Sequence, residues 1–281
     1  LPYNKRFAPF LRRSMPALSA FDPAALHRLL PEALARRLDL HWLGECASTN
    51  DEAMRLPLPD PGRLAVVGAD RQTRGRGRQD RVWQSWPDAS LTFSCLFAFP
   101  PGTSLEALPL AVGVALARGL QALGVPGVGL KWPNDLLIAG AKVAGVLIEA
   151  QSRHAAPTRV VVGIGLNLEL PPDFQPASGL PATALAHHLA PLPPREAVLA
   201  ALLERLDAVR ASYLAGRGFV PWRDEWNALD AYAGQEVAVR DGERELVGID
   251  AGVDDTGRLL LDTASGRIAC CVGDVSLRPL A

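Results

Sequence analysis

The chain has 281 residues, 48% of them hydrophobic and 21% charged, which is typical of a folded protein with one large and one small domain or two of middling size. A net charge of −1 argues against a general nucleic-acid binder, which needs a basic domain, and no apolar run reaches the ~18 residues of a membrane span. The four cysteines form no CxxC motif, so we expect reduced thiols and a cytoplasmic protein, not a zinc site or a disulfide framework.

Two short helices separated by a proline are expected near the start of the chain. Asp22 can cap the first helix and Pro23 suits its first turn, while Pro31 should break or kink it. We assign residues 1–40 to a partly irregular N-terminal segment.

The next stretch predicts one helix and two strands. Residues 48–54 open a helix in which Thr49 and Glu52 have the spacing of a capping box. Residues 63–70 and 90–99 are rich in apolar and aromatic residues and predict strands.

The middle of the chain predicts a helix followed by a sheet with tight turns. The helix covers residues 103–124, with a Thr103/Glu106 cap and Gly124 as its stop signal. Short β-rich runs separated by glycine, proline and asparagine then follow, at 128–132, 135–140, 141–150 and 158–168.

The last third changes from helix to strand. Residues 192–216 form a long amphipathic helix closed by Gly216, and residues 220–234 are expected to be helical as well. Residues 235–280 contain short strands with turns every few residues, which is typical of a small β barrel. We place the domain boundary near Ala233, giving domains at 41–232 and 233–281.

An arginine-rich loop, residues 71–83, follows directly on the predicted strand 63–70. Its sequence RQTRGRGRQDRVW holds five arginines, interleaved with Gly75 and Gly77. Glycine lets the backbone approach a ligand closely, and arginine presents a fork of donors that matches a phosphate or a carboxylate. The loop is neither a Walker A motif nor a Rossmann fingerprint, and a solvated turn remains the alternative.

Further motifs accompany this loop in a fixed order along the chain, and the combination resembles the biotin protein ligases over about residues 40–281. The matching pieces are STN (48–50), QxxGRGR (72–78) with RxW (81–83), KWPNDL (131–136), KxAGxLxE (142–149), GIGLN (163–167) and SLR (276–278). The resemblance implies an α+β fold, with a class II synthetase-like mixed sheet, flanking helices and a small C-terminal SH3-like β barrel.

The resemblance also implies a site with two parts. The STN residues would hold the ureido head of biotin, and the arginine loop would wrap its carboxylate and the phosphates of ATP. The biotin part would comprise Ser48, Thr49, Asn50, Gln72, Arg76, Gly77, Arg78, Lys142 and Gly145. The ATP and adenylate part would comprise Arg76, Arg78, Arg81, Trp83, Asn134, Asn167 and Arg278.

The implied reaction joins biotin to ATP as biotinyl-5′-AMP and then transfers biotin to a lysine. The first step brings two anions together, which takes fixed cations, and Arg78 and Lys142 are of suitable type. In the second step the lysine must lose a proton; Asp135 is a candidate acceptor, or it only orients an arginine of the loop. Mg²⁺ is expected with ATP, and we assign no metal site built from the protein.

The expected partner is the biotin carboxyl carrier domain of acetyl-CoA carboxylase. Strand edges near 141–150 or 159–168 could also pair two subunits into a homodimer, whereas no nucleic acid or membrane partner is expected. Only about forty residues precede the STN motif, without a helix-turn-helix pattern, so we expect a ligase without the DNA-binding winged helix. A lipoate-type acyl-adenylating ligase and a non-catalytic biotin-binding regulator are the alternatives.

Several of these residues have a purely structural alternative. The STN motif could only cap a helix, Lys142 could be a surface lysine of a strand, and Trp83 could be a core aromatic residue. For Trp132 we favour core packing. Asp80 stands where the family pattern has glycine, and it could pair with an arginine of the loop.

Overall fold

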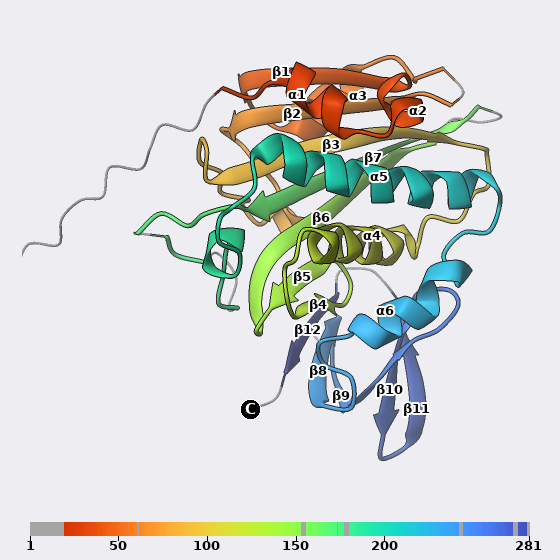
Figure 1. Cartoon of the computed structure of the whole chain (residues 1–281). Coiled ribbons are helices and arrows are strands. Elements are labelled where there is room, and N and C mark those ends of the chain that lie inside the picture. The colour runs from red at the N-terminus through yellow and green to blue at the C-terminus, as the bar shows by residue number, and fades with distance from the viewer. Residues whose placement is uncertain are drawn as a thin grey trace, which may run out of the picture.

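A seven-stranded mixed sheet forms the centre of the computed structural model, which describes residues 20–60, 62–152, 156–172, 174–176, 180–241, 244–271 and 275–279 (Figure 1). The strand order is β1-β2-β3-β7-β6-β5-β4; β1 and β2 run parallel, and the other neighbours are antiparallel. The strands are β1 (Leu38–Cys46), β2 (Leu64–Gln72), β3 (Ser90–Phe99), β4 (Val128–Lys131), β5 (Asp135–Ile138), β6 (Ala141–Gln151) and β7 (Thr158–Asn167).

Helices cover both faces of this sheet. The long helices α4 and α5 lie across one face, and the short α3 packs on the other, against β2, β3 and β7 (Figure 1). The α-helices are α1 (Pro23–Leu29), α2 (Glu32–Ala35), α3 (Thr49–Arg55), α4 (Leu108–Ala122), α5 (Arg195–Leu214) and α6 (Arg223–Leu229). Single 3₁₀ turns are η1 (Arg78–Asp80), η2 (Leu185–His187) and η3 (Val220–Trp222).

The side chains of the central strands alternate between two apolar clusters. In β2, Leu64 and Val66 belong to the main core with α4 and α5, whereas Ala65 and Val67 pack with Ala53 of α3. Because successive side chains of a strand point to opposite faces, the run is buried on both sides and reads as continuously hydrophobic. The same alternation decides which residues of β3 and β7 face the α3 side, where the candidate site lies.

A second, five-stranded antiparallel sheet follows at the C-terminal end, beside α6 (Figure 1). The expected fold class is thereby confirmed: a mixed sheet with flanking helices, and a small antiparallel β unit consistent with an SH3-like domain. The exact domain limits near residues 40 and 233 stay predictions. The strand order is β11-β10-β9-β8-β12, with β8 (Glu236–Asp241), β9 (Arg244–Val253), β10 (Leu259–Thr263), β11 (Gly266–Cys270) and β12 (Val275–Pro279).

The second sheet is docked on the KWPND turn of the first. The indole Nε1 of Trp132 donates to the carbonyl oxygen of Gly257 at 3.1 Å, and the Trp132 side chain is 1% exposed. Trp132 is therefore a core residue, as expected. A Cβ on Gly257 would lie 2.6 Å from that of Ala107, so this position accepts only glycine at such a close approach.

The local helix signals were followed at some ends and overridden at others. Asp22 caps α1 by accepting from the Ala24 amide at 2.8 Å, and the helix ends before Pro31, as expected. The expected cap at Thr103 is wrong: α4 begins at Leu108, and the Thr103 hydroxyl donates instead to the carbonyl of Pro100 in a turn. Tertiary packing of the helix decides where it starts, because a cap contributes only about 1 kcal/mol.

The expected capping box at the start of α3 is also absent. Ser48, not Thr49, is the N-cap residue, and it makes no side-chain cap bond. The Thr49 amide and hydroxyl both donate to the Gln72 side chain, and Glu52 pairs with Arg55. Thr49 and Glu52 therefore interact with Gln72 and Arg55, and not with each other's backbone. Near residue 230 the helix α6 ends at Leu229, five residues before the expected Gly234.

One of the two expected edges for a homodimer is not an edge. β7 is paired along its length with β3 and with β6, so residues 159–168 offer no free backbone to a second subunit. β6 pairs with β5 only over residues 141–145, so β5 does not cover the rest of the other expected edge, residues 146–150. A homodimer stays a prediction.

Two buried carboxyl groups meet where the second sheet docks. Asp230 follows α6, and Asp250 lies in β9, 2% exposed. One oxygen of Asp230 accepts the Tyr232 amide at 3.0 Å, and one of Asp250 accepts the Gly252 amide at 2.9 Å. Burial, followed by the charge of Asp250, raises the pKa of Asp230 to about 7, and burial also raises the pKa of Asp250. The pair therefore holds a proton well above pH 4.

This carboxyl pair predicts a fold that is more stable in mild acid than at pH 8. An unfolded Asp loses its proton near pH 4, so the stabilisation from Asp230 is full below that pH and is lost as pH rises through about 7. We expect Asp230→Asn to remove most of this pH dependence, a change of roughly 5 °C in Tm between pH 5.5 and pH 8. Thermal unfolding followed by circular dichroism measures it; equal pH slopes in both proteins would contradict the assignment.

Candidate functional site

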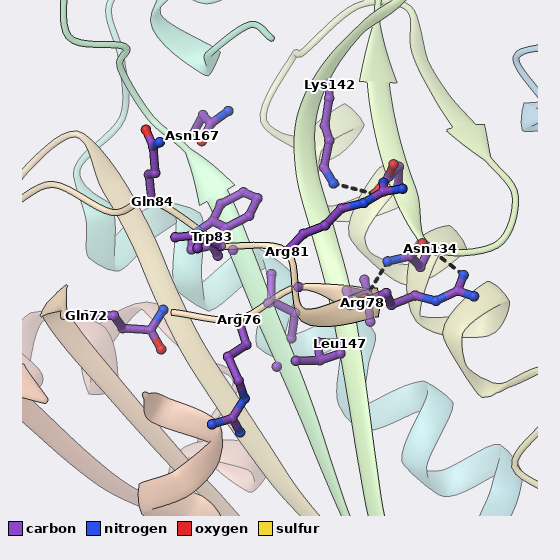
Figure 2. A pocket seen from close by; sticks show the side chains of 18 of the residues that line it. Gln72, Arg76, Arg78, Arg81, Trp83, Gln84, Asn134, Lys142, Leu147 and Asn167 are labelled. Carbon is purple, nitrogen blue, oxygen red and sulfur yellow. Dashed lines mark hydrogen bonds and ion pairs between the residues drawn. The ribbon is translucent and has the colours of Figure 1, made fainter. Parts of the chain in front are cut away.

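A large pocket opens on the α3 side of the main sheet, lined by the arginine loop (Figure 2) and by Phe174, Pro176, Leu180 and Ala182. It contains about 1100 Å³ of empty space, open mouth included. Its lining combines polar side chains with glycines and a few apolar residues. The lining residues used below are Ser48, Thr49, Asn50, Gln72, Arg76, Gly77, Arg78, Arg81, Trp83, Asn134, Asp135, Lys142, Gly145, Leu147, Gly163, Gly165 and Asn167.

Glycines form the floor of the pocket because larger residues would fill it. Gly163 of β7 lies in register with Ser94 of β3 and Leu147 of β6. A Cβ on Gly163 would lie 2.1 Å from Asn50 Oδ1, and one on Gly165 would lie 2.2 Å from a ring carbon of Trp83. The two glycines thus let Asn50 and Trp83 lie directly on the sheet.

The STN end of the pocket is a network of neutral hydrogen-bonding groups. Thr49 donates to Gln72 Oε1 from its amide at 2.7 Å and from its hydroxyl at 3.1 Å. The hydroxyl of Ser94 lies 2.8 Å from Thr49 Oγ1 and 2.7 Å from Asn50 Oδ1. Ser48, Thr49 and Asn50 are each under 5% exposed. This end can accept and donate several hydrogen bonds to a compact polar ring.

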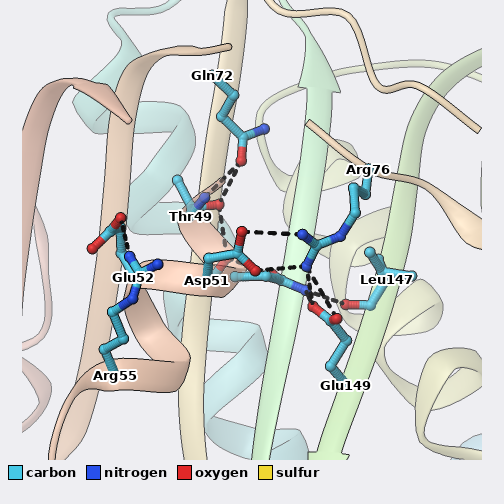
Figure 3. Close-up of polar contacts among 10 residues, drawn as sticks. Thr49, Asp51, Glu52, Arg55, Gln72, Arg76, Leu147 and Glu149 are labelled. Atoms are coloured by element: carbon cyan, nitrogen blue, oxygen red, sulfur yellow. Dashed lines mark hydrogen bonds and ion pairs between the residues drawn. The ribbon is translucent and has the colours of Figure 1, made fainter. Parts of the chain in front are cut away.

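Two acids and one arginine border the same end. The side-chain Nδ2 of Asn50 donates to Glu149 Oε2 at 2.6 Å. Arg76 forms a two-bond fork with Asp51, at 3.0 and 2.7 Å, and reaches Glu149 at 3.1 Å (Figure 3). The hydrogen bond from Arg76 holds the pKa of Asp51 below its usual range. Sequence reasoning gave no role to Asp51 or Glu149, although Glu149 closes one of the motifs.

The arginine loop is a closed ring of backbone. The Trp83 amide donates to the carbonyl of Gly75 at 2.9 Å, and the Gly77 amide donates to the carbonyl of Arg81 at 2.7 Å. A Cβ on Gly75 would lie 2.4 Å from the Trp83 carbonyl oxygen, which explains the glycine there. Gln79, not a glycine, has the positive φ of 55° in this turn. The side chain of Asp80 lies outside the described part of the structure, so its expected pairing with an arginine stays untested.

The other end of the pocket is rich in cations. Lys142 Nζ lies 2.6 Å from Asp135 Oδ1, and Lys131 Nζ lies 3.8 Å from Asp135 Oδ2. Arg78 donates to Asn134 Oδ1 at 3.4 Å, and Arg81 extends to the same side (Figure 2). Burial, opposed by Asp135, lowers the pKa of Lys131, and the positive charge of Lys142 lowers it further.

Lysine is rare in this chain, which makes these two positions informative. The sequence has three lysines, Lys5, Lys131 and Lys142, although it holds 29 basic residues in all. An ammonium is a compact charge on a flexible stem, whereas a guanidinium is a wide planar fork. Two of the three lysines thus lie beside one carboxylate, Asp135, and place compact cations at this end of the pocket.

The structure brings nearly all the expected site residues into one pocket. Gly145 lies beneath Lys142, and Asn167 donates to the Thr183 carbonyl at 3.0 Å at the far side. The backbone of Arg278 lies in β12, but its side chain is outside the described residues. Whether any of them binds a ligand stays a prediction. Sequence reasoning missed Gln84, Leu147, Gly163, Gly165, Phe174 and Leu180, of which Leu147 and the two glycines belonged to recognised motifs.

Two family models match the sequence. The Biotin/lipoate A/B protein ligase family matches residues 43–167, and the Biotin protein ligase C terminal domain matches residues 232–278. A biotin–[acetyl-CoA-carboxylase] ligase of Paracoccus denitrificans is 35% identical over 234 residues, covering 80% of this chain and 95% of the relative. The chain belongs to the biotin protein ligase family. The resemblance drawn from the motifs is thereby confirmed.

Solved structures of this family share the fold. The biotin protein ligase from Aquifex aeolicus in complex with biotin and ATP superposes with a TM-score of 0.74 at 29% identity, covering 86% of this chain and 99% of that one. A second curated relative, the biotin–[acetyl-CoA-carboxylase] ligase of Mycobacterium tuberculosis, is 33% identical and covers 75% of this chain and 77% of its own length. Among the described residues, no helix is long and apolar enough to cross a membrane.

Proposed function

We propose that the chain activates biotin with ATP to biotinyl-5′-AMP, and then transfers biotin to a lysine of a carboxylase carrier domain as an amide. The related ligases from Paracoccus and Mycobacterium are named for acetyl-CoA carboxylase, and the Aquifex ligase was solved with biotin and ATP. We also propose that the protein is cytoplasmic.

The observation that carries the proposal is the contrast between the two ends of the pocket. The STN end offers buried neutral groups, of which Thr49 and Asn50 are 3% and 4% exposed. The opposite end presents Arg78, Arg81 and Lys142 around Asp135. Biotin has a neutral ureido ring at one end and a carboxylate at the other, and ATP adds phosphates on the carboxylate side. The pocket therefore matches a molecule of this polarity in one orientation.

In the first step the biotin carboxylate attacks the α-phosphorus of ATP. One P–O bond forms, the bond to the β-phosphate oxygen breaks, and pyrophosphate leaves with the electron pair. No general base is needed, because the nucleophile is already ionised. Lys142 is placed to offset the repulsion between the two anions, and a fixed cation costs no reorganisation at the moment of reaction.

In the second step a lysine amine of the carrier attacks the acyl carbon and AMP leaves. The amine must lose a proton to become an amide nitrogen. Asp135 forms ion pairs with two lysines, Lys142 at 2.6 Å and Lys131 at 3.8 Å. This pairing favours a role for Asp135 in holding Lys142, over that of proton acceptor.

Magnesium fits the site as a companion of the nucleotide. In the described part of the chain, no group of three or more His, Cys, Asp or Glu side chains could hold a metal ion. Mg²⁺ is commonly bound through one or two carboxylates plus substrate phosphates. Asp135, the carboxylate at the cationic end of the pocket, is already paired with Lys142 at 2.6 Å, so the ATP phosphates would hold the ion. The ion would neutralise charge on the departing pyrophosphate.

Biotin-dependent ATP–pyrophosphate exchange tests the proposal on the purified chain. We expect exchange with biotin and none with lipoate as the control acid. Transfer of biotin to a carrier domain, followed by mass spectrometry, tests the second step separately. Exchange with lipoate alone would replace the substrate and keep the mechanism, whereas no exchange with either acid would exclude adenylation.

Substitution of Arg78 should weaken retention of the intermediate. Its side chain contacts Asn134 at the cationic end, so we expect Arg78→Gly to release biotinyl-5′-AMP about tenfold faster, since a charge-assisted clamp is removed. Dissociation measured by rapid filtration gives the rate. An unchanged release rate would count against a contact between Arg78 and the adenylate.

A further inference from the structure

Within the loop ring, residues 75–83, the side chains of Arg76, Arg78 and Trp83 contact the rest of the protein. Trp83 lies on the floor at Gly165, and Arg78 reaches Asn134 at the cationic end. Arg76 reaches in the other direction, to α3 and β6 (Figure 3). In Figure 2 its side chain points away from Lys142, whereas Arg78 and Arg81 extend to the Asn134 side.

The guanidinium of Arg76 is occupied by protein carboxylates. Both terminal nitrogens donate to Asp51 as a fork, and Nη2 also reaches Glu149 Oε1 at 3.1 Å. Hydrogen bonding to Asp51 raises the pKa of Arg76, the ordinary consequence of such a fork. A planar fork on a carboxylate is the geometry in which arginine binds most strongly.

The partners of Arg76 are themselves fixed in place. Glu149 accepts the Asn50 amide at 2.6 Å, and Asn50 is held between Ser94 and the floor at Gly163. Arg76 is therefore the outermost member of a chain of contacts that begins in the buried STN end. Isolated exposed ion pairs contribute little to stability, but a bidentate pair within a network is the exception.

The charges at this end also disfavour an anionic ligand on Arg76. If the guanidinium turned to a ligand carboxylate or phosphate, Asp51 and Glu149 would lose their shared cation beside the incoming negative charge. Like charges repel, so two carboxylates without a cation disfavour an anion at this position. Lys142, Arg78 and Arg81 are placed at the cationic end for that task.

We propose that Arg76 is a positioning residue whose guanidinium ties the arginine loop to α3 and β6 through Asp51 and Glu149, leaving the ligand's anionic groups to Arg78, Arg81 and Lys142. This deepens the proposed function and rests on it. It replaces the expectation that the Arg76 side chain wraps the biotin carboxylate and the phosphates. The anchor holds the loop ring, residues 75–83, over the pocket.

Asp51→Asn separates the two roles, because Asp51 is a partner of Arg76 and does not line the pocket. If Arg76 anchors the loop, we expect release of biotinyl-5′-AMP to be about fivefold faster in Asp51→Asn and equally so in Arg76→Gln, with no further change in the double variant. Asp51→Glu, which restores a carboxylate, should recover most of the slow release. Arg74→Gln removes the same charge from an exposed position of the loop and should have little effect.

Limited trypsin digestion of the ligand-free protein gives a readout independent of biotin chemistry. Asp51→Asn leaves every arginine of the loop in place, so any faster cleavage reports a looser loop; we expect about a fivefold increase, with an unchanged Tm. Failed adenylation with faster cleavage would refute the proposed function and keep the anchor. Unchanged cleavage, or tighter adenylate binding in Asp51→Asn because Arg76 is freed for the ligand, would overturn the anchor.

Discussion

Lys142→Ala is expected to lose at least ~100-fold of biotin-dependent ATP–pyrophosphate exchange, because removing one preorganised charge at a reacting centre typically costs that much. Lys142 belongs to β6, which lines the pocket, and its Nζ lies 2.6 Å from Asp135 Oδ1. Its position is therefore fixed before the ligands enter. The loss should be in kcat more than in the KM for biotin, since the charge acts most on the transition state.

Lys142→Arg is the control for charge, and the Tm of Lys142→Ala is the control for stability. Lys142→Arg keeps the positive charge but widens its head, and we expect it to retain part of the activity. The side chain is 23% exposed and the strand keeps its ladder bonds, so the Tm of Lys142→Ala should change by only a few degrees. Near-normal exchange in Lys142→Ala with an intact fold would remove Lys142 from the reaction.

The second large effect is expected from a single methyl group on the pocket floor. Gly163→Ala would place a Cβ 2.1 Å from Asn50 Oδ1, and Asn50 cannot retreat because Ser94 and Glu149 hold its amide at 2.7 and 2.6 Å. A displacement of about 1 Å at a positioning group can cost ~100-fold. We expect that loss in kcat/KM for biotin, with the KM for ATP less affected.

Gly44→Ala is the matched control for the floor glycine. Gly44 lies in β1, and a Cβ there would meet nothing within 4 Å. Both substitutions restrict the backbone of a strand glycine in the same way. A difference between the two variants therefore reports the contact with Asn50. Isothermal titration with biotin alone measures binding at the STN end directly. Equal affinities in the two variants would show that Asn50 does not shape the biotin pocket.

Local patterns in the sequence were sufficient for most elements of the fold. The strands β2 and β7 are apolar over most of their length because both faces of the sheet are covered, and the sequence shows them as apolar runs. In β3 the first half alternates polar and apolar residues, which also predicts a strand. The long helix α5 ends before Gly216, whose φ of 71° suits glycine. Helix starts were less predictable, as Thr103 and Thr49 show, since a cap is worth less than the packing that competes with it.

Many of the pocket residues could be predicted from the sequence, because their types, spacing and order form motifs that identify the biotin protein ligase family. The partner of each charged residue could not, because it depends on how distant segments pack together. Arg76 lies 25 residues from Asp51 and 73 from Glu149, and no local pattern predicts that pairing. Charges pair by distance in space, and the fold brings Asp51 of α3 and Glu149 of β6 together at the Arg76 guanidinium (Figure 3).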